Sequence, residues 1–402
     1  MMKPPMLSFD EALARLLAGA QPLSAIEEVD TFDANGRVLA RDQMSAIDVP
    51  PHDNSSMDGY AVRLADLPSA GVRLRVDQRI PAGSVGHSLE PGSAARIFTG
   101  APVPAGADAV VMQELCERDG DEVIVNHRPH AGEAIRLRGE DISTGQVILS
   151  AGTRIGPAES GQLASVGLAR VPVFRRFRVA VFSTGDELAM PGEPLRDGAI
   201  YNSNRYVLRS LLSNLGCEVE DLGIVEDTLE ATRAALRRAA ACDLIVTSGG
   251  VSVGEEDHVK PAVEAEGRLE MWKIAIKPGK PLAFGRVGEA AAFIGLPGNP
   301  VSALVTFQML VRPFILRSQG VLEVVPRAHS VAAAFDWPRP DRRREFLRAR
   351  LNAEGRLELY PNQSSGVLTS CVWADGLVDN PPDTTIAAGE MVRFIPFSEL
   401  LY

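Results

Sequence analysis

The chain has 402 residues and a hydrophobic content of 45%, which is ordinary for a globular protein and sufficient for two to four domains. Its formal net charge of −11 argues against a nucleic-acid-binding protein, because that function needs a basic face to neutralise phosphates. Its four cysteines are scattered without CxxC spacing, so we expect reduced thiols in a cytoplasmic protein and neither a disulfide framework nor a zinc site.

No membrane partner is expected either. The first residues lack the apolar core of a signal peptide. Residues 290–311 carry no charge and are long enough to span a bilayer, but they contain the sequence GLPGNP, which would break a spanning helix. A strand, a loop and a helix are the better interpretation of this stretch.

The N-terminal third predicts a small β-domain inserted into a linker domain. Ser8 and Glu11 have the spacing of a capping box, which predicts a helix that ends near Gly19. Residues 52–138 contain short apolar runs separated by Gly and Pro, the pattern of a small β-domain. We therefore assign residues 1–51 and 139–175 to the linker, with a second helix that begins at Pro157.

Residues 176–325 are expected to form an α/β domain around a parallel sheet, and residues 326–402 a C-terminal β-barrel. Three short apolar runs, at 177–188, 243–260 and 291–307, each lead into a glycine-rich turn. Runs of this kind are typical of strands buried on both faces, and the helical segments between them favour βαβ units. In such a sheet, ligands bind beyond the carboxyl ends of the strands.

The turns at these strand ends predict a site for an anion. Glycine-rich turns let backbone N–H groups approach a phosphate or another oxyanion closely. None of the turns matches the P-loop or the GxGxxG fingerprint, which argues against a mononucleotide kinase or a nicotinamide enzyme. The groups expected to contact the ligand are Thr184, Gly185, Ser248, Gly249, Gly250, Pro297, Gly298, Asn299 and Pro300.

Carboxylates beside these turns predict a magnesium site. Glu187 and Asp257 both follow glycine turns, and hard oxygen ligands next to an anion are what Mg²⁺ requires when it bridges to phosphate. Asp227 stands before Thr-Leu-Glu, so it is either a ligand or the N-cap of the following helix.

The spacing of two lysines predicts a shared contact with an anion. Lys273 and Lys277 lie four residues apart, so on one strand they would share a face and reach one anion. The arginine runs at 175–178 and 342–344 are interpreted as solvated surface. Asp58 and Thr99 are isolated polar groups on loops.

Together these segments resemble the MoeA family, the molybdopterin molybdenumtransferases that include the E domain of gephyrin. The resemblance covers essentially the whole chain and rests on seven motifs in family order: SSMDGYA (55–61), FTGAPVP (98–104), RGEDI (138–142), STGDEL (183–188), TSGGVSVGEEDHVK (247–260), KIAIKPGKP (273–281) and GLPGNPVS (295–302). It implies an elongated homodimer of four-domain subunits, with a central domain folded like the small molybdopterin adenylyltransferases. It also implies insertion of molybdenum from molybdate into adenylated molybdopterin with Mg²⁺, releasing AMP and the molybdenum cofactor.

The family's functional positions carry over motif by motif to this chain. They are Asp58, Thr99, Arg136, Asp141, Glu187, Asp227, Asp257, Lys273, Lys277, Pro297 and Pro300, with Arg348 and Ser365 matching more loosely. Leu137 stands where the family often has an arginine, which would weaken one anion contact. The resemblance implies a composite active site in which Asp58 and Thr99 reach the partner subunit, and transient contacts with the adenylyltransferase and with cofactor-accepting apoenzymes.

Three other functions stay open at this point. A homologue using tungstate would share every feature, because the two oxyanions have the same charge and similar size. A nucleotide pyrophosphatase or adenylyltransferase would need only the site at the sheet edge. A non-catalytic scaffold that binds molybdopterin would keep the fold without the acids and lysines, which are intact here.

Overall fold

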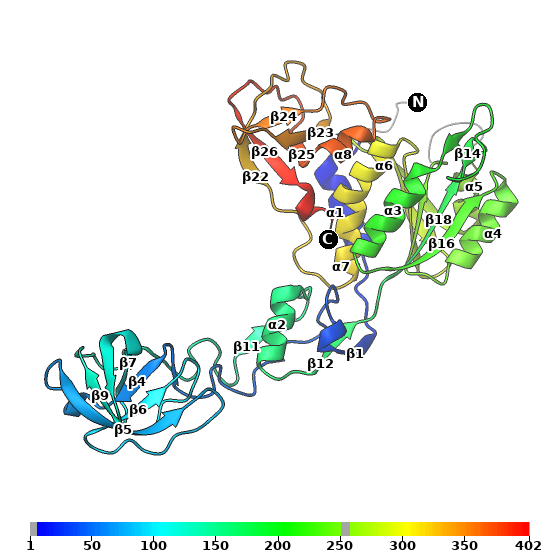
Figure 1. Cartoon of the computed structure of the whole chain (residues 1–402). Helices are drawn as coiled ribbons and strands as arrows, with labels where there is room; N and C mark the ends of the chain where they lie inside the picture. Colours follow the sequence, from blue (N-terminus) through cyan, green and yellow to red (C-terminus); the bar gives the residue numbers. More distant parts are fainter. Residues whose placement is uncertain (1–5, 251–257, 402) are drawn as a thin grey trace.

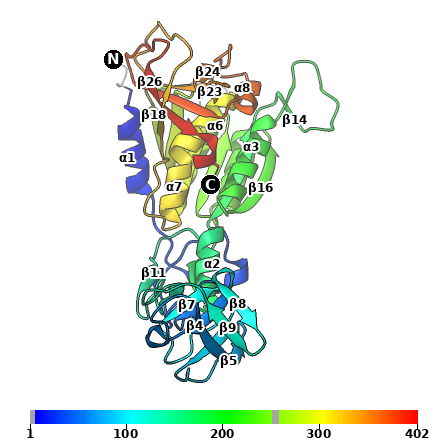
Figure 2. The same ribbon diagram turned by 60° about the vertical axis from the view of Figure 1, so that its left-hand side comes forward.

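The computed structural model describes residues 6–250 and 258–401 of an elongated chain (Figure 1). A β-sheet domain lies at one end, and an α/β sheet and a second β-domain lie together at the other, with a slender connector between them (Figure 1, Figure 2). Within the described ranges, no helix combines the length and the apolar composition needed to cross a membrane.

The connector is built from segments on both sides of the inserted domain. β1 (Ile26–Asp30) pairs with β12 (Arg170–Phe174), and β2 (Gln43–Met44) pairs with β11 (Val147–Leu149), both antiparallel. A 3₁₀ turn, η1 (Thr31–Asp33), and α2 (Pro157–Ser165) pack on them. The buried side chains of this small core are Ala34, Leu39, Ile155, Leu163, Val171 and Val173. Because the chain leaves and returns through this core, the predicted insertion is confirmed.

The inserted domain contains a six-stranded sheet in the order β7-β4-β6-β5-β9-β8. All its pairs are antiparallel except the pair between β5 and β6. A short pair, β3 (Asn54–Ser55) with β10 (Ile135–Arg136), lies where the domain meets the connector. The remaining elements are β4 (Gly59–Val62), η2 (Leu64–Asp66), β5 (Val72–Ile80), β6 (Ser93–Ile97), β7 (Ala109–Met112), η3 (Gln113–Leu115), β8 (Cys116–Asp119) and β9 (Glu122–Val125).

The α/β sheet has the order β16-β13-β17-β21-β20-β18. The first four strands are parallel, which confirms the predicted parallel sheet, and the last two add an antiparallel edge. The strands are β13 (Arg178–Thr184), β16 (Glu218–Val225), β17 (Leu244–Ser248), β18 (Gly267–Lys273), β20 (Pro281–Val287) and β21 (Ala291–Leu296). From β13 the chain runs to β16 on one side and then to β17 on the other, so the carboxyl ends of β13 and β17 flank a topological switch point.

Helices cover both faces of this sheet. One face packs on α1 (Phe9–Gly19), α3 (Ser203–Asn214), α6 (Pro300–Thr306), a π-helical turn η4 (Phe307–Val311) and α7 (Arg312–Ser318). The other face packs on α4 (Leu229–Ala239) and α5 (Val259–Glu266). A short pair, β14 (Leu188–Ala189) with β15 (Ile200–Tyr201), extends from the end of β13. α1 begins at the predicted capping box, where the Glu11 amide donates to Ser8 Oγ at 3.2 Å.

The C-terminal domain is a small barrel, as predicted. Its strands are β22 (His329–Ala332), β23 (Arg344–Leu351), β24 (Leu357–Leu359), β25 (Gly376–Asn380) and β26 (Met391–Pro396), with α8 (Thr369–Trp373) and η5 (Phe397–Glu399) outside the sheet. A bridge between Ala333 and Leu357 connects the β22 edge to β24 and closes the barrel. A short strand of the α/β region, β19 (Ile276–Lys277), pairs in parallel with β23.

Side chains of the N-terminal helix α1 pack against side chains of the C-terminal barrel. The rings of Phe9 and Phe346 meet edge to face at 5.5 Å. The Arg344 guanidinium lies 4.7 Å from the Phe9 ring centre and pairs with Asp10 at 3.0 Å and with Asp379 at 2.6 Å. This junction fixes the barrel against the α/β sheet.

The first prediction concerns this junction. Phe346 is fully buried, so we expect Phe346→Ala to lower the free energy of unfolding by about 3–5 kcal/mol, through lost burial and a cavity. Phe32 is 94% exposed, and Phe32→Ala is the matched control, with an expected change within about 0.5 kcal/mol. Urea unfolding followed by circular dichroism measures both, and equal losses would contradict the role of Phe346.

Candidate active site

Two adjoining cavities lie at the carboxyl ends of β13, β17 and β21. The cationic cavity, of about 590 Å³, lies between the α/β sheet and the barrel. The strand-end cavity, of about 510 Å³, lies between the same strand ends and the start of α3. Gly249, Gly298 and Asn299 line both. The two cavities therefore adjoin in one candidate site, at the edge of the sheet that the sequence predicted.

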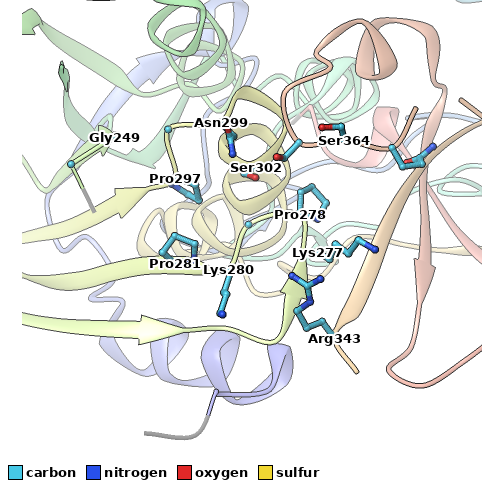
Figure 3. A pocket seen from close by; sticks show the side chains of 15 residues that line it. Gly249, Lys277, Pro278, Lys280, Pro281, Pro297, Asn299, Ser302, Arg343 and Ser364 are labelled. Carbon is cyan, nitrogen blue, oxygen red and sulfur yellow. The ribbon is translucent and has the colours of Figure 1, made fainter. Parts of the chain in front are cut away.

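Three cations from two domains line the cationic cavity (Figure 3). Lys277 and Lys280 lie in the segment that precedes β20, and Arg343 is the residue immediately before β23. Side chains that can hydrogen-bond an oxyanion line the same space. They are Ser302, Gln363, Ser364 and Ser365.

Carboxylates of the barrel already hold two of these cations. Lys277 Nζ lies 2.9 Å from Glu345 Oε1 and 3.5 Å from Asp341 Oδ2. Asp341 also accepts two side-chain hydrogen bonds from Arg343, which hold the pKa of this carboxyl well below its usual range. Lys280 is exposed and takes part in no ion pair among the residues that the structure describes.

The loop that carries the two lysines requires glycine at its centre. Gly279 has a φ of +106°, which L side chains rarely adopt. A Cβ at this position would also lie 2.2 Å from Thr306 Oγ1. The loop therefore packs directly on α6. This packing holds Lys277 and Lys280, on either side of Gly279, at the cavity wall.

The strand-end cavity is lined by polar groups from four segments. Thr184 and Ser248 end two strands, and the turn after β17 has positive φ at Gly249 and Gly250, which lets its backbone fold closely over the strand ends. The Asn204 side chain donates to the Gly298 carbonyl at 2.7 Å and so ties α3 to the turn after β21.

Glu187 brings one carboxylate to the strand-end cavity. Its side chain folds back over Gly185, where a Cβ would lie 2.5 Å from Glu187 Oε2. Asp257, the second predicted magnesium ligand, lies outside the described residues. Within the described ranges, no group of three or more His, Cys, Asp or Glu side chains could hold a metal by itself.

Most residues predicted at this edge do line the two cavities. They are Thr184, Glu187, Ser248, Gly249, Gly250, Lys277, Pro297, Gly298, Asn299, Pro300 and Ser365. Gly185 lies in the turn under Glu187, and Asp227 follows the end of β16. The N-cap of α4 is Thr228, whose Oγ1 accepts from the Ala231 amide, so the interpretation of Asp227 as the cap is wrong.

Two predictions about basic residues are wrong. Lys273 ends β18, whereas Lys277 belongs to β19 in another sheet, so the two lysines do not share a strand face. The run at 342–344 is not simply solvated surface, because Arg343 lines the cationic cavity and Arg344 pairs with Asp379.

Arg348 is buried and does not line either cavity. Its guanidinium donates to Ser370 Oγ at 3.1 Å and to the Phe346 carbonyl at 3.1 Å. It also donates to the Ser364 carbonyl at 3.5 Å and so contacts the segment that carries Ser364 and Ser365.

A second cluster of predicted residues lies in the inserted domain, at the opposite end of the molecule from the cavities (Figure 1). Asp58 and Thr99 are not isolated, because Asp58 Oδ1 accepts from both the amide and the hydroxyl of Thr99 at 2.8 Å. These bonds lower the pKa of Asp58. Arg136 pairs with Asn54 next to this cluster, and Asp141 lies exposed at the connector.

The sequence reading missed several residues of the site. Lys280 lies outside the four-residue spacing that singles out Lys273 and Lys277, and Arg343 lies within an arginine run. The other missed residues are Ser302, Gln363, Ser364, Asn202, Ser203 and Asn204. The KPGKP motif offered one usable signal, since it places two lysines around a glycine at a turn.

Comparison with known proteins agrees with this architecture along the whole chain. Residues 7–167 match the family described as MoeA N-terminal region (domain I and II), residues 180–317 match a probable molybdopterin binding domain, and residues 330–397 match the MoeA C-terminal region (domain IV).

Full-length relatives and a solved structure give the same result. The chain is 41% identical to the molybdopterin molybdenumtransferase of Haemophilus influenzae, over 98% of this chain and 100% of that protein. It is 38% identical to molybdopterin molybdenumtransferase 2 of Mycobacterium tuberculosis, over 95% and 96%. The crystal structure of the molybdopterin biosynthesis moeA protein from Pyrococcus horikoshii OT3 aligns with a TM-score of 0.84 at 29% identity, over 98% and 100%. The chain therefore belongs to the MoeA family of molybdopterin molybdenumtransferases.

Proposed function

We propose that this protein transfers molybdenum from molybdate to adenylated molybdopterin and releases AMP and the molybdenum cofactor. The observation that carries the proposal is that the two cavities adjoin and share lining residues. One presents cations and hydroxyl groups suited to a tetrahedral oxyanion, and the other presents glycine turns suited to a phosphate-bearing ligand. The two substrates can therefore meet over Gly249 and Gly298.

Molybdate binds in the cationic cavity in this proposal. Lys277, Lys280 and Arg343 are its charged contacts, and Ser302 and Ser364 supply neutral donors. Lysine and arginine bind oxyanions through charge-assisted hydrogen bonds, which are stronger than neutral ones. Tungstate would bind by the same contacts, so the transfer assay is run with both oxyanions.

The pyrophosphate link of adenylated molybdopterin lies in the strand-end cavity, against the turns after β13 and β17. Glu187 and Asp257 would hold Mg²⁺ there, with phosphate oxygens completing its shell. The exposed Glu187 carboxylate at the strand end fits this role. When bound, the ion would neutralise charge at the phosphorus. Lys273 and Asp227, beyond the cavity lining, would contact outer parts of the ligand.

The active site is completed by a second copy of the chain. In one subunit the Asp58–Thr99 cluster lies at the far end of the molecule from the cavities (Figure 1). In a C₂ dimer each subunit can offer this cluster to the cavities of the other. The protein would then act in the cytoplasm as a homodimer, receiving adenylated molybdopterin from the adenylyltransferase and delivering the cofactor to apoenzymes.

The function is tested by AMP release from adenylated molybdopterin in the presence of Mg²⁺. Release is expected to require molybdate, which distinguishes transfer from a pyrophosphatase. Glu187→Ala should lower the rate by roughly a hundredfold or more, because a group that stabilises charge at the phosphate is lost. AMP release at the same rate without any oxyanion would favour the pyrophosphatase, and no release at all would favour the scaffold.

Lys277→Ala and Lys280→Ala should each raise the half-saturating concentration of molybdate by roughly tenfold or more, because each removes a charge-assisted hydrogen bond. The half-saturating concentration of the adenylated pterin should change much less. Arg356→Ala, which removes an exposed cation of the same barrel, is the control and should leave both values unchanged. If the rate depends on molybdate concentration in both lysine variants as it does in the wild type, molybdate does not bind in this cavity.

The shared site predicts complementation between two inactive proteins. Asp58→Ala and Glu187→Ala are each expected to be inactive alone. In a mixed dimer one site carries both lesions and the other carries neither. With random exchange at equal amounts, about half the dimers are mixed, so activity should recover to about a quarter of wild type. If verified mixed dimers stay inactive, Asp58 and Glu187 of one active site come from the same subunit.

A further inference from the structure

The cationic cavity carries its own negative charge. Lys277, Lys280 and Arg343 line it, and two of these cations are paired with Asp341 and Glu345 of the barrel. The formal charge of the cluster is therefore +1 and not +3. A cavity evolved only for tight binding of a dianion would not place carboxylates behind its cations.

Glu345 is the more deeply placed of the two carboxylates. It has no solvent exposure, and its oxygens accept from Lys277 at 2.9 Å, from Trp337 Nε1 at 2.7 Å and from Asn380 at 3.3 Å. Its backbone is fixed as well, because Lys277 of β19 stands opposite Glu345 of β23 in the strand register. Both the side chain and the backbone of Glu345 are therefore held in place by these partners.

Lys277 can contact an anion while it stays on Glu345. Its side chain is 40% exposed, and its ammonium group has three protons. Glu345 accepts one at 2.9 Å and Asp341 lies 3.5 Å away, which leaves at least one proton for an anion. An oxyanion bound to the exposed side of Lys277 would then be separated from the buried Glu345 carboxylate only by the Lys277 ammonium group. At that separation, repulsion between like charges is large enough to change affinity measurably.

We propose that Glu345 is a built-in counter-charge that lowers the affinity of the cationic cavity for its oxyanion. The proposal rests on the function proposed above, in which this cavity holds molybdate. Binding that stabilises the bound substrate and the transition state equally does not raise the turnover rate. A cavity that must give up its molybdenum gains from holding the oxyanion weakly. The opposite possibility, that Glu345 strengthens binding by orienting Lys277, predicts the opposite sign in the same experiment.

The test is Glu345→Gln, which keeps the size of the side chain and its ability to accept from Trp337 but removes the charge. Equilibrium dialysis of the full-length protein gives the dissociation constants of molybdate and of perrhenate, a tetrahedral oxyanion of similar size with a single negative charge. Because Coulomb energy is proportional to ligand charge, about tenfold tighter molybdate binding should accompany only about threefold tighter perrhenate binding. The ratio of the two constants does not depend on how much of the sample is folded.

Two further variants serve as controls. Glu345→Asp keeps the charge and should keep the weak binding of the wild type. Asp379→Asn removes another buried carboxylate of the barrel, which pairs with Arg344 and Arg393 and does not line the cavity, and it should leave the ratio unchanged.

Each outcome decides the question. Tighter molybdate binding with a raised selectivity for molybdate over perrhenate supports the counter-charge. Weaker binding, or equal changes for the two anions, overturns it and assigns Glu345 to orientation or packing. Lys280→Ala in the same assay separates the two proposals. If Lys280→Ala leaves molybdate binding unchanged, the cavity is not the oxyanion site and the proposed function falls first. If it weakens binding while Glu345→Gln does not tighten it, only the counter-charge is wrong.

Discussion

The pairing of β19 with β23 is the contact on which the geometry of the cationic cavity depends. Lys277 belongs to the α/β region, whereas Arg343, Asp341 and Glu345 belong to the barrel, and this pairing brings them together. The contact is held from outside by the packing of Phe9 on Phe346. Phe346 directly follows Glu345 on β23, so this packing supports the strand that carries the Glu345 carboxylate.

The strands and turns of the site could be predicted because they depend on residues that are close together in the sequence. β17 and β21 are buried along their whole length, so their sequences are mostly apolar, and the glycines that follow them mark the turns. The capping box at Ser8 also involves residues only three positions apart. Such patterns are visible in one sequence without knowledge of the fold.

The electrostatic partners could not be predicted because their cause is long-range. Lys277 and Glu345 are 68 residues apart, and Asp58 and Thr99 are 41 apart, so only the fold joins them. The error over Lys273 has the same origin. A spacing of four indicates one face only within a continuous strand, and the chain here turns from the α/β sheet into the barrel sheet between the two lysines.

The position of the Asp58–Thr99 cluster limits how it can act. To reach the cavities of its own subunit, the inserted domain would have to swing back across the connector. That connector contains two antiparallel strand pairs and a buried core around Leu39, Ile155 and Leu163. Its core resists bending, because a hinge there would expose apolar side chains and break strand pairing. A second copy of the chain needs no such distortion. The stiffness of the connector therefore favours a site completed by the partner over one completed by domain closure.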